Sequence, residues 1–464
     1  MVKLIVEPST LRGSVRIPGS KSHTIRAVVI ASLAEGTSQI LEPLDSLDTV
    51  ACVRVCEGLG AEIERCGPPL RGGDWPATVV RPSGAEAENQ SASERRTTPE
   101  KQSATASPEW VVKGVGGKPA VPSHVLDVMN SGTTLYVTLS TAALADGWSV
   151  FTGDDQIRAR PAAPLLAALE GLGARAFSTR GNGCAPILVR GPIRGGRVAI
   201  ACPTSQYLTS LLLNCPLADG ETEIEVTKLN EQPYVEMTLA WLDEQGIRYE
   251  REAFSRFRMP GGQRYQAFRK EVPGDFSSAT FFLCAAAATG SELTLLGLDR
   301  KDTQGDKAVV EMLAAMGAEV EWLPRGVRIR GRELRGGEFD LNATPDALPA
   351  MAVAACCARG ETRLVNVAQA RIKETDRICV MRSELTKMGA RVEELPDGLV
   401  IQGGSLRGAV VDGHADHRVV MALAVAGLAA SGRTEITTAE AAGVTFPNFV
   451  QLMASLGARM RGEE

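Results

Sequence analysis

The sequence predicts an α/β protein of two domains, built from six βαβαββ-like units with a buried central helix in each. Three observations support this prediction. The chain of 464 residues is too long for one ordinary hydrophobic core, so two domains are expected. Six amphipathic helix patterns each end at a glycine and run into a short strand pattern. Six further helix patterns are apolar on every face.

The glycine endings show the repeat. The glycines lie 113, 73, 71, 72 and 68 residues apart, which is a repeat of about 71 residues that is stretched once. Glycine commonly follows the last turn of a helix because it adopts a left-handed conformation without strain. Each ending therefore marks an outer helix that leads into a strand. The endings are Leu59-Gly60-Ala61, Leu172-Gly173-Ala174, Gln245-Gly246-Ile247, Met316-Gly317-Ala318, Met388-Gly389-Ala390 and Leu456-Gly457-Ala458.

The apolar helices are expected at the centre of the units, because a helix without a polar face must be buried on all sides. Strand patterns such as Val198-Ala199-Ile200 and Glu292-Leu293-Thr294-Leu295 flank them. Together these patterns predict repeated βαβαββ units in an α/β architecture. The expected central helices cover residues 24–34, 133–145, 206–218, 278–288, 348–358 and 418–430.

Residues 82–108 break the repeat. They contain no aromatic residue and no aliphatic residue larger than alanine, and they are rich in Ser, Glu, Thr and Pro. Such a segment cannot bury enough apolar surface to become ordered. It accounts for much of the extra length of the first repeat, and we predict a flexible surface insertion.

Composition excludes several classes of protein. A net charge of −5 argues against a general nucleic-acid or anionic-membrane surface. No apolar run reaches the roughly 18 residues that a membrane span needs. The strand pattern at residues 1–6 shows no signal or transit segment, so a cytoplasmic location is expected. The ten cysteines form no CxxC pair and are interpreted as reduced core residues. His414 and His417 have a weak metal-ligand spacing without a third ligand cluster, so no metal is predicted.

Chemistry is expected where the apolar helices begin. Small polar residues precede each of them, and helix capping explains those residues. Capping does not explain Lys21, Gln206 or Arg418 beside them. Any one cation is most simply a solvated surface charge. Helix N-termini attract anions, however, and a cleft at which several of them converged would attract phosphate and carboxylate. Further cations occur at Arg26, Arg160, Lys373 and Arg377.

Six short strings stand out along the chain: Pro18-Gly19-Ser20-Lys21-Ser22 with Arg26, Arg160-Pro161, Ser205-Gln206, Pro345-Asp346-Ala347, Lys373-Glu374-Thr375-Asp376-Arg377 and Asp416-His417-Arg418. Together they resemble the EPSP synthase (3-phosphoshikimate 1-carboxyvinyltransferase) family of enolpyruvyl transferases. The first and fifth strings are specific, and the others support the resemblance by their order. The resemblance spans nearly the whole chain apart from residues 82–108.

The resemblance implies a reaction and an architecture. The 5-hydroxyl of shikimate 3-phosphate attacks C2 of phosphoenolpyruvate as C3 is protonated, and phosphate then leaves the tetrahedral adduct. No metal or organic cofactor takes part, and the partners are these two small molecules rather than a nucleic acid or a membrane. The implied fold is a monomer of two domains with three repeats each. The chain crosses twice, so that residues 1–18 with 274–464 form one domain and residues 19–273 the other.

The resemblance also implies site residues. Asp346 takes the proton of the 5-hydroxyl, Glu374 handles the proton at C3, and Lys21 is the third catalytic residue. Shikimate 3-phosphate is held by Lys21, Ser22, Arg26, Thr204, Ser205, Gln206, Asp346 and Lys373. Phosphoenolpyruvate is held by Lys21, Gly132, Arg160, Gln206, Arg377 and Arg418.

Three positions depart from the family pattern, and they bear on affinity more than on the reaction. Val444 stands where some members have a lysine, and Tyr136 where many have arginine or lysine. Glu231 lies in a segment where a serine would often contact substrate, and no role is assigned to it.

Two other functions are weighed. A UDP-N-acetylglucosamine 1-carboxyvinyltransferase usually has a cysteine five residues before the arginine that corresponds to Arg160, but Asp155 stands there. That family also has Lys-Asn where this chain has Lys21-Ser22. A non-catalytic anion-binding paralogue would be expected to lose its acid–base groups, yet Asp346 and Glu374 are both present.

Overall fold

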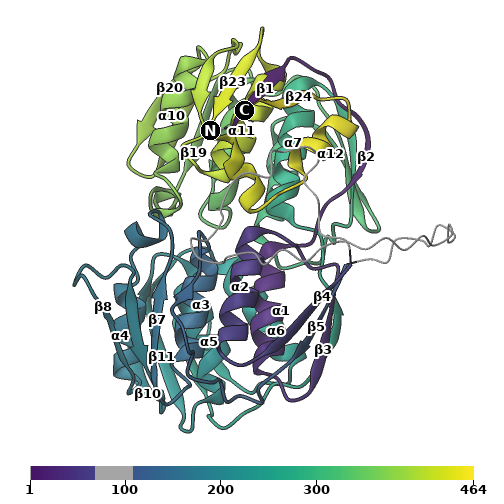
Figure 1. The fold of residues 1–464 in the computed structure, drawn as a ribbon. Coiled ribbons are helices and arrows are strands. Elements are labelled where there is room, and N and C mark those ends of the chain that lie inside the picture. The colour runs from purple at the N-terminus through teal and green to yellow at the C-terminus, as the bar shows by residue number, and fades with distance from the viewer. Residues whose placement is uncertain (1, 68–107, 464) are drawn as a thin grey trace, which may run out of the picture.

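The chain folds into two lobes, each with its own hydrophobic core (Figure 1). The computed structural model describes residues 2–67 and 108–463. Helices α1–α6 form the N-lobe, and helices α7–α12 form the C-lobe, which also holds both ends of the chain. The predicted insertion at 82–108 lies outside the described residues, except for Pro108.

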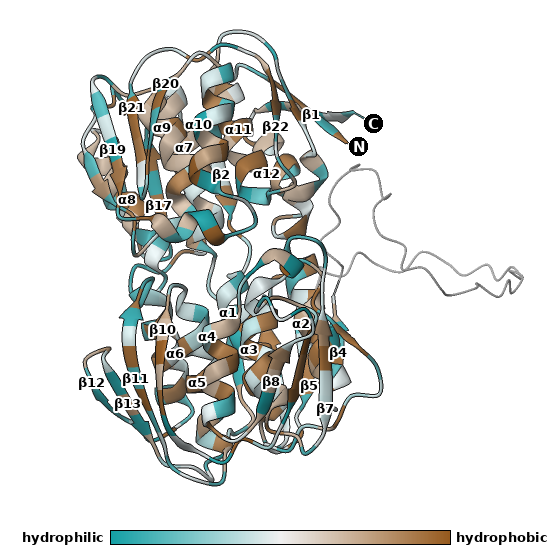
Figure 2. Ribbon diagram, turned by 90° about the vertical axis from the view of Figure 1, so that its left-hand side faces the viewer, coloured by the Kyte–Doolittle hydropathy of each residue, from teal (hydrophilic) through white to brown (hydrophobic). Residues whose placement is uncertain are grey.

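Three central helices fill each lobe, as the apolar patterns predicted. Their residues are almost all buried, and the helices of one lobe pack against one another. Figure 2 shows hydrophobic residues along these helices and mixed hydropathy on the strands around them. The N-lobe helices are α1 (Lys21–Leu33), α3 (Gly132–Ala142) and α5 (Ser205–Asn214). The C-lobe helices are α7 (Phe276–Thr289), α9 (Leu348–Cys356) and α11 (His417–Ala429).

The outer helices end at the six predicted glycines. Gly60, Gly173, Gly246, Gly317, Gly389 and Gly457 all have left-handed backbones, with φ between 68° and 110°. A side chain would be strained in this conformation, so glycine is required to turn the chain into the next strand. The outer helices are α2 (Leu47–Gly58), α4 (Ala163–Gly171), α6 (Gln232–Glu244), α8 (Ala308–Ala315), α10 (Arg377–Lys387) and α12 (Phe449–Ser455).

Across the described residues, six four-stranded sheets surround the helices, and all have one pairing pattern. In the sheet β10 (Gly196–Cys202), β11 (Thr222–Leu229), β13 (Arg256–Met259) and β12 (Glu250–Glu252), the first pair is parallel and the other two pairs are antiparallel. The chain order β10-α5-β11-α6-β12-β13 is the predicted βαβαββ unit.

The other sheets repeat this order of pairing. The remaining N-lobe sheets are β6 (Leu126–Asp127), β7 (Trp148–Thr152), β9 (Ile187–Arg190) and β8 (Arg175–Ser178), and β14 (Arg269–Glu271), β3 (Thr37–Leu41), β5 (Glu109–Lys113) and β4 (Glu62–Cys66). The C-lobe sheets are β2 (Arg12–Arg16), β15 (Glu292–Leu296), β17 (Gly326–Arg330) and β16 (Glu319–Leu323); β18 (Glu338–Asp340), β19 (Glu361–Val365), β21 (Gly398–Gln402) and β20 (Arg391–Leu395); and β22 (Val410–Asp412), β23 (Thr434–Thr437), β1 (Lys3–Glu7) and β24 (Arg459–Glu463).

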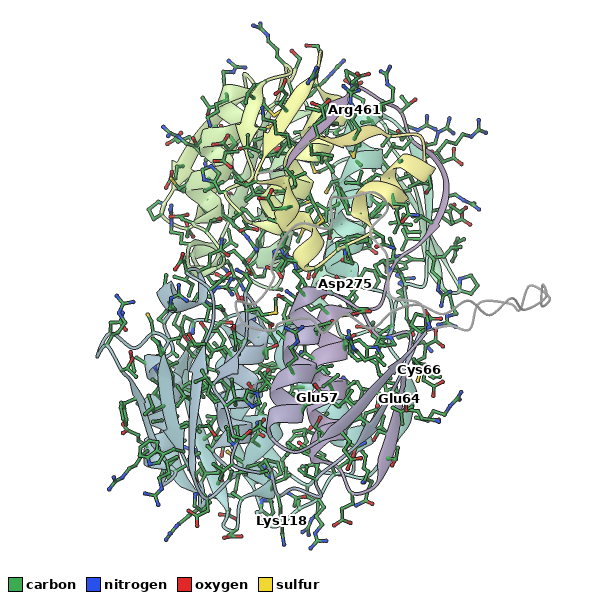
Figure 3. The ribbon with its side chains drawn as sticks, in the orientation of Figure 1. Glu57, Glu64, Cys66, Lys118, Asp275 and Arg461 are labelled. Carbon is green, nitrogen blue, oxygen red and sulfur yellow. The ribbon has the colours of Figure 1, made fainter. Side chains whose placement is uncertain are left out.

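The chain passes between the lobes in two adjacent antiparallel segments. Ser20 donates its backbone N–H to Pro273 at 2.8 Å, and Asp275 donates to Pro18 at 2.9 Å. Gly19 permits this close approach, because a Cβ there would lie 2.3 Å from the carbonyl oxygen of Glu42. Figure 3 places Asp275 at the junction of the lobes, where its side chain caps α7. The crossing segments thus lead directly into α1 and α7.

Seven of the ten cysteines are buried, Cys357 is half-buried, and none of the ten forms a disulfide. Cys66 and Cys379 are exposed, so the prediction of a core position is wrong for these two. Cys66 is the last residue of an edge strand, and Cys379 lies in the first turn of the outer helix α10. An outer helix has one solvent-exposed face, and the sequence pattern did not show that Cys379 lies on it. Within the described ranges, no helix has the length and apolarity needed to cross a membrane.

Candidate active site

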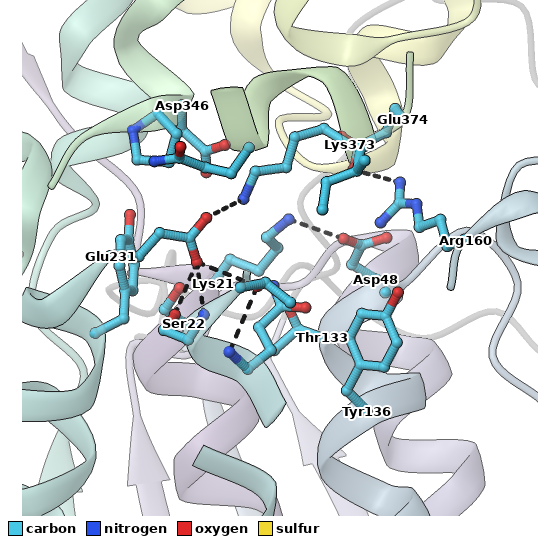
Figure 4. A pocket seen from close by; sticks show the side chains of 18 of the residues that line it. Lys21, Ser22, Asp48, Thr133, Tyr136, Arg160, Glu231, Asp346, Lys373 and Glu374 are labelled. Carbon is cyan, nitrogen blue, oxygen red and sulfur yellow. Dashed lines mark hydrogen bonds and ion pairs between the residues drawn. The ribbon is translucent and has the colours of Figure 1, made fainter. Parts of the chain in front are cut away.

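All thirteen predicted site residues line one cavity between the lobes (Figure 4). The N-termini of α1, α3 and α5 reach it from the N-lobe, and those of α10 and α11 reach it from the C-lobe. A 3₁₀ turn (Pro345–Ala347) carries Asp346 to the same place just before α9. The free volume is about 60 Å³, which is enough for only a few water molecules. The side chains therefore contact one another across the cavity.

The cavity is rich in charge. Its lining includes six cationic side chains and four carboxylates, an excess of two positive charges. Lys21 forms an ion pair of 3.0 Å with Asp48, at the first turn of α2. Such a buried cationic site attracts anions strongly, because the low dielectric weakens screening.

Two ion pairs join the lobes across the cavity. Arg160 of the N-lobe lies 2.8 Å from Glu374 of the C-lobe, and Lys373 of the C-lobe lies 2.6 Å from Glu231 of the N-lobe. The Nε of Arg160 is buried and has no hydrogen-bond partner among the described residues. This donor is available to a ligand that enters the cavity.

Arg377 forms the centre of a buried network in the C-lobe. Its guanidinium lies 2.8 Å from Asp346, 2.5 Å from Glu374 and 2.8 Å from Asp416. Arg418 contacts the other oxygen of Asp346 at 2.8 Å. Since Arg377 is only 1% exposed, these carboxylates depend on it for charge compensation.

Arg26 differs from the other cations because its hydrogen-bond partners among the described residues are all neutral oxygens. Its guanidinium donates to the hydroxyls of Thr238 and Thr209 at 3.0 and 3.2 Å, and to the carbonyls of Ser22 and Tyr234 at 3.0 and 2.9 Å. Burial lowers its pKa to about 10, so it stays charged at neutral pH. A buried, uncompensated positive charge is a strong site for a ligand carboxylate.

The start of α5 holds an internal carboxylate. Thr204 Oγ1, Ser205 N and Ser205 Oγ donate to one oxygen of Glu231, at 3.1, 3.0 and 2.8 Å. Gln206 turns away and donates to Thr133 of α3 at 3.0 Å. Three donors and a lysine on one carboxylate are typical of an anion site at a helix N-terminus.

Gly132 lets Arg160 lie against the start of α3. A Cβ at this position would lie 2.3 Å from Nη1 of Arg160. Tyr136, one turn along α3, donates to the carbonyl of Pro161 at 3.0 Å, and Tyr207 donates to the same oxygen. Tyr136 thus fixes the Arg160-Pro161 segment by a neutral hydrogen bond.

The cations control the ionisation of the two candidate catalytic carboxylates. Burial alone would raise the pKa of Asp346, but the charges of Arg418 and Lys373 hold it well below its usual range. Burial likewise acts to raise the pKa of Glu374, and Arg160 and Arg377 lower it well below its usual value. Both groups are therefore ionised at neutral pH and weakly basic as long as the cations face them.

Four further residues line this cavity although they are not among the thirteen predicted site residues. Glu231, Asp48 and Tyr234 line the cavity, as does His417, whose pKa burial lowers to about 3, leaving it neutral. The Nε2 of His417 and the Oδ1 of Asp48 are buried without a hydrogen-bond partner among the described residues. His417 stands in the Asp416-His417-Arg418 string, for which the resemblance implies a substrate contact by Arg418 alone, and Asp48 stands in no motif that would indicate it. In the described part of the chain, no three His, Cys, Asp or Glu side chains are placed to hold a metal ion.

Comparisons with family models, curated proteins and solved structures all indicate the same family. The family model described as EPSP synthase (3-phosphoshikimate 1-carboxyvinyltransferase) matches residues 5–68 and 98–453. The 3-phosphoshikimate 1-carboxyvinyltransferase of Ruminiclostridium cellulolyticum is 51% identical over 98% of this chain and 99% of its own length. That of Acetivibrio thermocellus is 52% identical over 98% of both chains. The structure of an EPSP synthase from Acinetobacter baumannii aligns with this one over 100% of both chains, with a TM-score of 0.77 and 25% sequence identity.

Proposed function

The chain belongs to the EPSP synthase (3-phosphoshikimate 1-carboxyvinyltransferase) family and is a transferase that acts on phosphoenolpyruvate and shikimate 3-phosphate, and we propose that the cavity between its lobes is the active site. The enolpyruvyl group passes to the 5-hydroxyl of shikimate 3-phosphate, and phosphate is released. The observation that carries the assignment of the site is the convergence of all thirteen predicted residues on one cationic cavity.

Shikimate 3-phosphate is placed on the N-lobe side. Its phosphate binds at the start of α5, through Thr204 and Ser205, with Lys373 closing over it from the C-lobe. Its carboxylate binds at Arg26 and Ser22, because this guanidinium has no carboxylate partner within residues 2–67 and 108–463. Gln206 contacts both substrates. The charges of the substrate thus match the two positive centres of the N-lobe.

Phosphoenolpyruvate is placed between Arg160 and the cations Lys21, Arg377 and Arg418, beside Gly132. Arg160 and Arg377 pair with Glu374 in this structure, so phosphoenolpyruvate competes with that carboxylate for the two guanidinium groups. A bidentate guanidinium–carboxylate or guanidinium–phosphate contact is stronger than most single hydrogen bonds, which favours the exchange.

The exchange activates the catalytic carboxylates. When the substrate anions take over Arg418, Lys373 and Arg377, the charges that lower the pKa of Asp346 are neutralised, and its basicity rises. Asp346 then removes the proton of the 5-hydroxyl as the oxygen attacks C2. Glu374, released from Arg160 in the same way, takes up a proton from solvent as the substrates bind, delivers it to C3 and regains one from the resulting methyl group as phosphate leaves. The proton that Asp346 took from the 5-hydroxyl passes to the departing phosphate, so both carboxylates return to their starting state. Lys21 and the arginines stabilise the charge of the leaving phosphate.

A cysteine nucleophile, expected for the UDP-N-acetylglucosamine enzyme, is absent from the part of the cavity wall that the structure describes. The test is release of phosphate from phosphoenolpyruvate in the presence of shikimate 3-phosphate, compared with UDP-N-acetylglucosamine. We expect release with the first acceptor only. Release with UDP-N-acetylglucosamine alone would refute the assignment.

Three further features are proposed with this function. The domains are residues 1–18 with 274–464, and 19–273, which is supported by the two separate cores. The enzyme acts as a monomer, since all thirteen predicted site residues of one chain meet in one cavity and none has to come from a partner. It works in the reducing cytoplasm, which is supported by ten cysteines without a disulfide. Light scattering of the purified protein tests the monomer directly.

A further inference from the structure

Glu231 occupies the place that the proposed function gives to the substrate phosphate. Its carboxylate is 2% exposed and accepts from Ser205 N, Ser205 Oγ and Thr204 Oγ1, while Lys373 lies 2.6 Å away. Figure 4 shows this carboxylate between the start of α5 and Lys373. An anion is therefore already bound at the start of the helix, and the protein supplies it.

The donors at this position cannot serve two anions at once. A backbone N–H and a hydroxyl each have one hydrogen, and those of Ser205 and Thr204 are directed at Glu231. A phosphate that is to bind Ser205 must first displace the carboxylate. The cavity, with about 60 Å³ of free volume, leaves little space for both.

The backbone holds Glu231 in this position. Its φ of 59° and ψ of 42° are left-handed, a conformation uncommon for a residue with a side chain. The N–H of Glu231 donates to Asn342 Oδ1 of the C-lobe at 3.4 Å, and Asn342 Nδ2 donates to Asn230 at 3.3 Å. The same residue that fills the anion site thus ties the two lobes together through its backbone and its carboxylate.

We propose that Glu231 is an internal competitor of the substrate phosphate, which lowers the affinity of the α5 site for every phosphate ligand and joins the lobes through Lys373 until substrate displaces it. This inference rests on the proposed function only in naming shikimate 3-phosphate as the ligand. The phosphate dianion carries more charge than a carboxylate and therefore prevails in the exchange. Glu231 thereby sets the affinity of the α5 site for phosphate.

The test uses two variants and three ligands in the full-length protein. Glu231→Ser removes the carboxylate, and Glu231→Gln keeps its shape without the charge. Calorimetry gives the Kd of shikimate 3-phosphate, inorganic phosphate and shikimate. Glu236→Gln is the control, since Glu236 lies on α6, the helix that begins directly after Glu231, and pairs with Arg251 at 3.0 Å, outside the cavity.

Simple competition predicts that Glu231→Ser binds shikimate 3-phosphate and inorganic phosphate about tenfold more tightly, by similar factors for the two. Glu231→Gln shifts both in the same direction by a smaller factor. Shikimate has no phosphate to compete, so its Kd stays unchanged, as do all three values in Glu236→Gln. Circular dichroism confirms that each variant is folded, and the glutamine variant carries the test if the serine variant is not.

A Kd for shikimate 3-phosphate that is unchanged or weaker in both variants would overturn the proposal, because Glu231 would then be neutral or would help to hold the substrate. A gain for shikimate equal to that for shikimate 3-phosphate would overturn it too. Failure of the proposed function looks different: the wild-type protein would release no phosphate with shikimate 3-phosphate, whereas the effect on inorganic phosphate would remain measurable.

Discussion

Gly132→Ala tests the position of Arg160 most sharply. The new methyl group would lie 2.3 Å from Arg160 Nη1, while ordinary contact begins near 3.4 Å, so the guanidinium must move by about 1 Å. Arg160 cannot move freely, because Glu374 holds it at 2.8 Å and it is only 7% exposed. A displacement of this size at a substrate-positioning group costs up to about 100-fold in rate or affinity.

We expect the KM for phosphoenolpyruvate to rise about 10- to 100-fold in Gly132→Ala, which is about 1.4–2.7 kcal/mol of binding free energy. The Kd for shikimate 3-phosphate stays within about twofold of wild type, because Arg26 and the start of α5 are untouched. Steady-state kinetics and calorimetry give the two values. Gly404→Ala is the matched control, since a Cβ there meets no atom within 4 Å. A normal KM for phosphoenolpyruvate in Gly132→Ala would refute the placement of that substrate at Arg160.

Three other substitutions have distinct expected outcomes. Asp346→Asn removes the base, so kcat falls by about 100-fold or more while the Kd of shikimate 3-phosphate changes by less than about threefold. Kinetics and calorimetry measure the two values, and a parallel change in both would show that Asp346 only binds the substrate. Arg377→Ala leaves Asp346, Glu374 and Asp416 without their shared cation, so the free energy of unfolding falls by about 3–5 kcal/mol. Urea denaturation measures this loss, and a loss below about 1 kcal/mol would contradict the buried network. Burial, together with the charge of Asp346, raises the pKa of Asp306 to about 6. The folded state therefore binds this proton more tightly than the unfolded state does. The stability that the protonated Asp306 contributes below about pH 4 is lost as the pH rises through about 6. Asp306→Asn should remove that loss, about 3 kcal/mol between pH 4 and 7, and an unchanged stability–pH profile would contradict the raised pKa.

The repeat could be predicted from the sequence because its signals are local. A left-handed turn after an outer helix needs glycine, and a helix buried on all sides needs apolar residues at every position. Gly60 and its five counterparts, with the apolar helices, therefore gave the α/β units directly. The pairing of β14 with β3, far apart in the chain, has no local signal, and the double crossing came from the family resemblance.

The candidate site was predictable where residues stand in short strings and not where contacts are made in space. Lys373 and Arg377 belong to one string, so the resemblance indicated both. Glu231 is distant in sequence from Lys373, and its left-handed backbone has no pattern that would predict it. Nor could the sequence show that Arg26 meets no carboxylate in the part of the chain that the structure describes, because that depends on what packs around it from α5 and α6.

A crystal structure of the complex with shikimate 3-phosphate tests most directly the claim that the cavity between the lobes is the active site. We predict that the phosphate lies within hydrogen-bond distance of Ser205 and Lys373, that the ligand carboxylate meets Arg26, and that the 5-hydroxyl faces Asp346. A ligand bound elsewhere, or bound in this cavity with its 5-hydroxyl away from Asp346, would contradict the account.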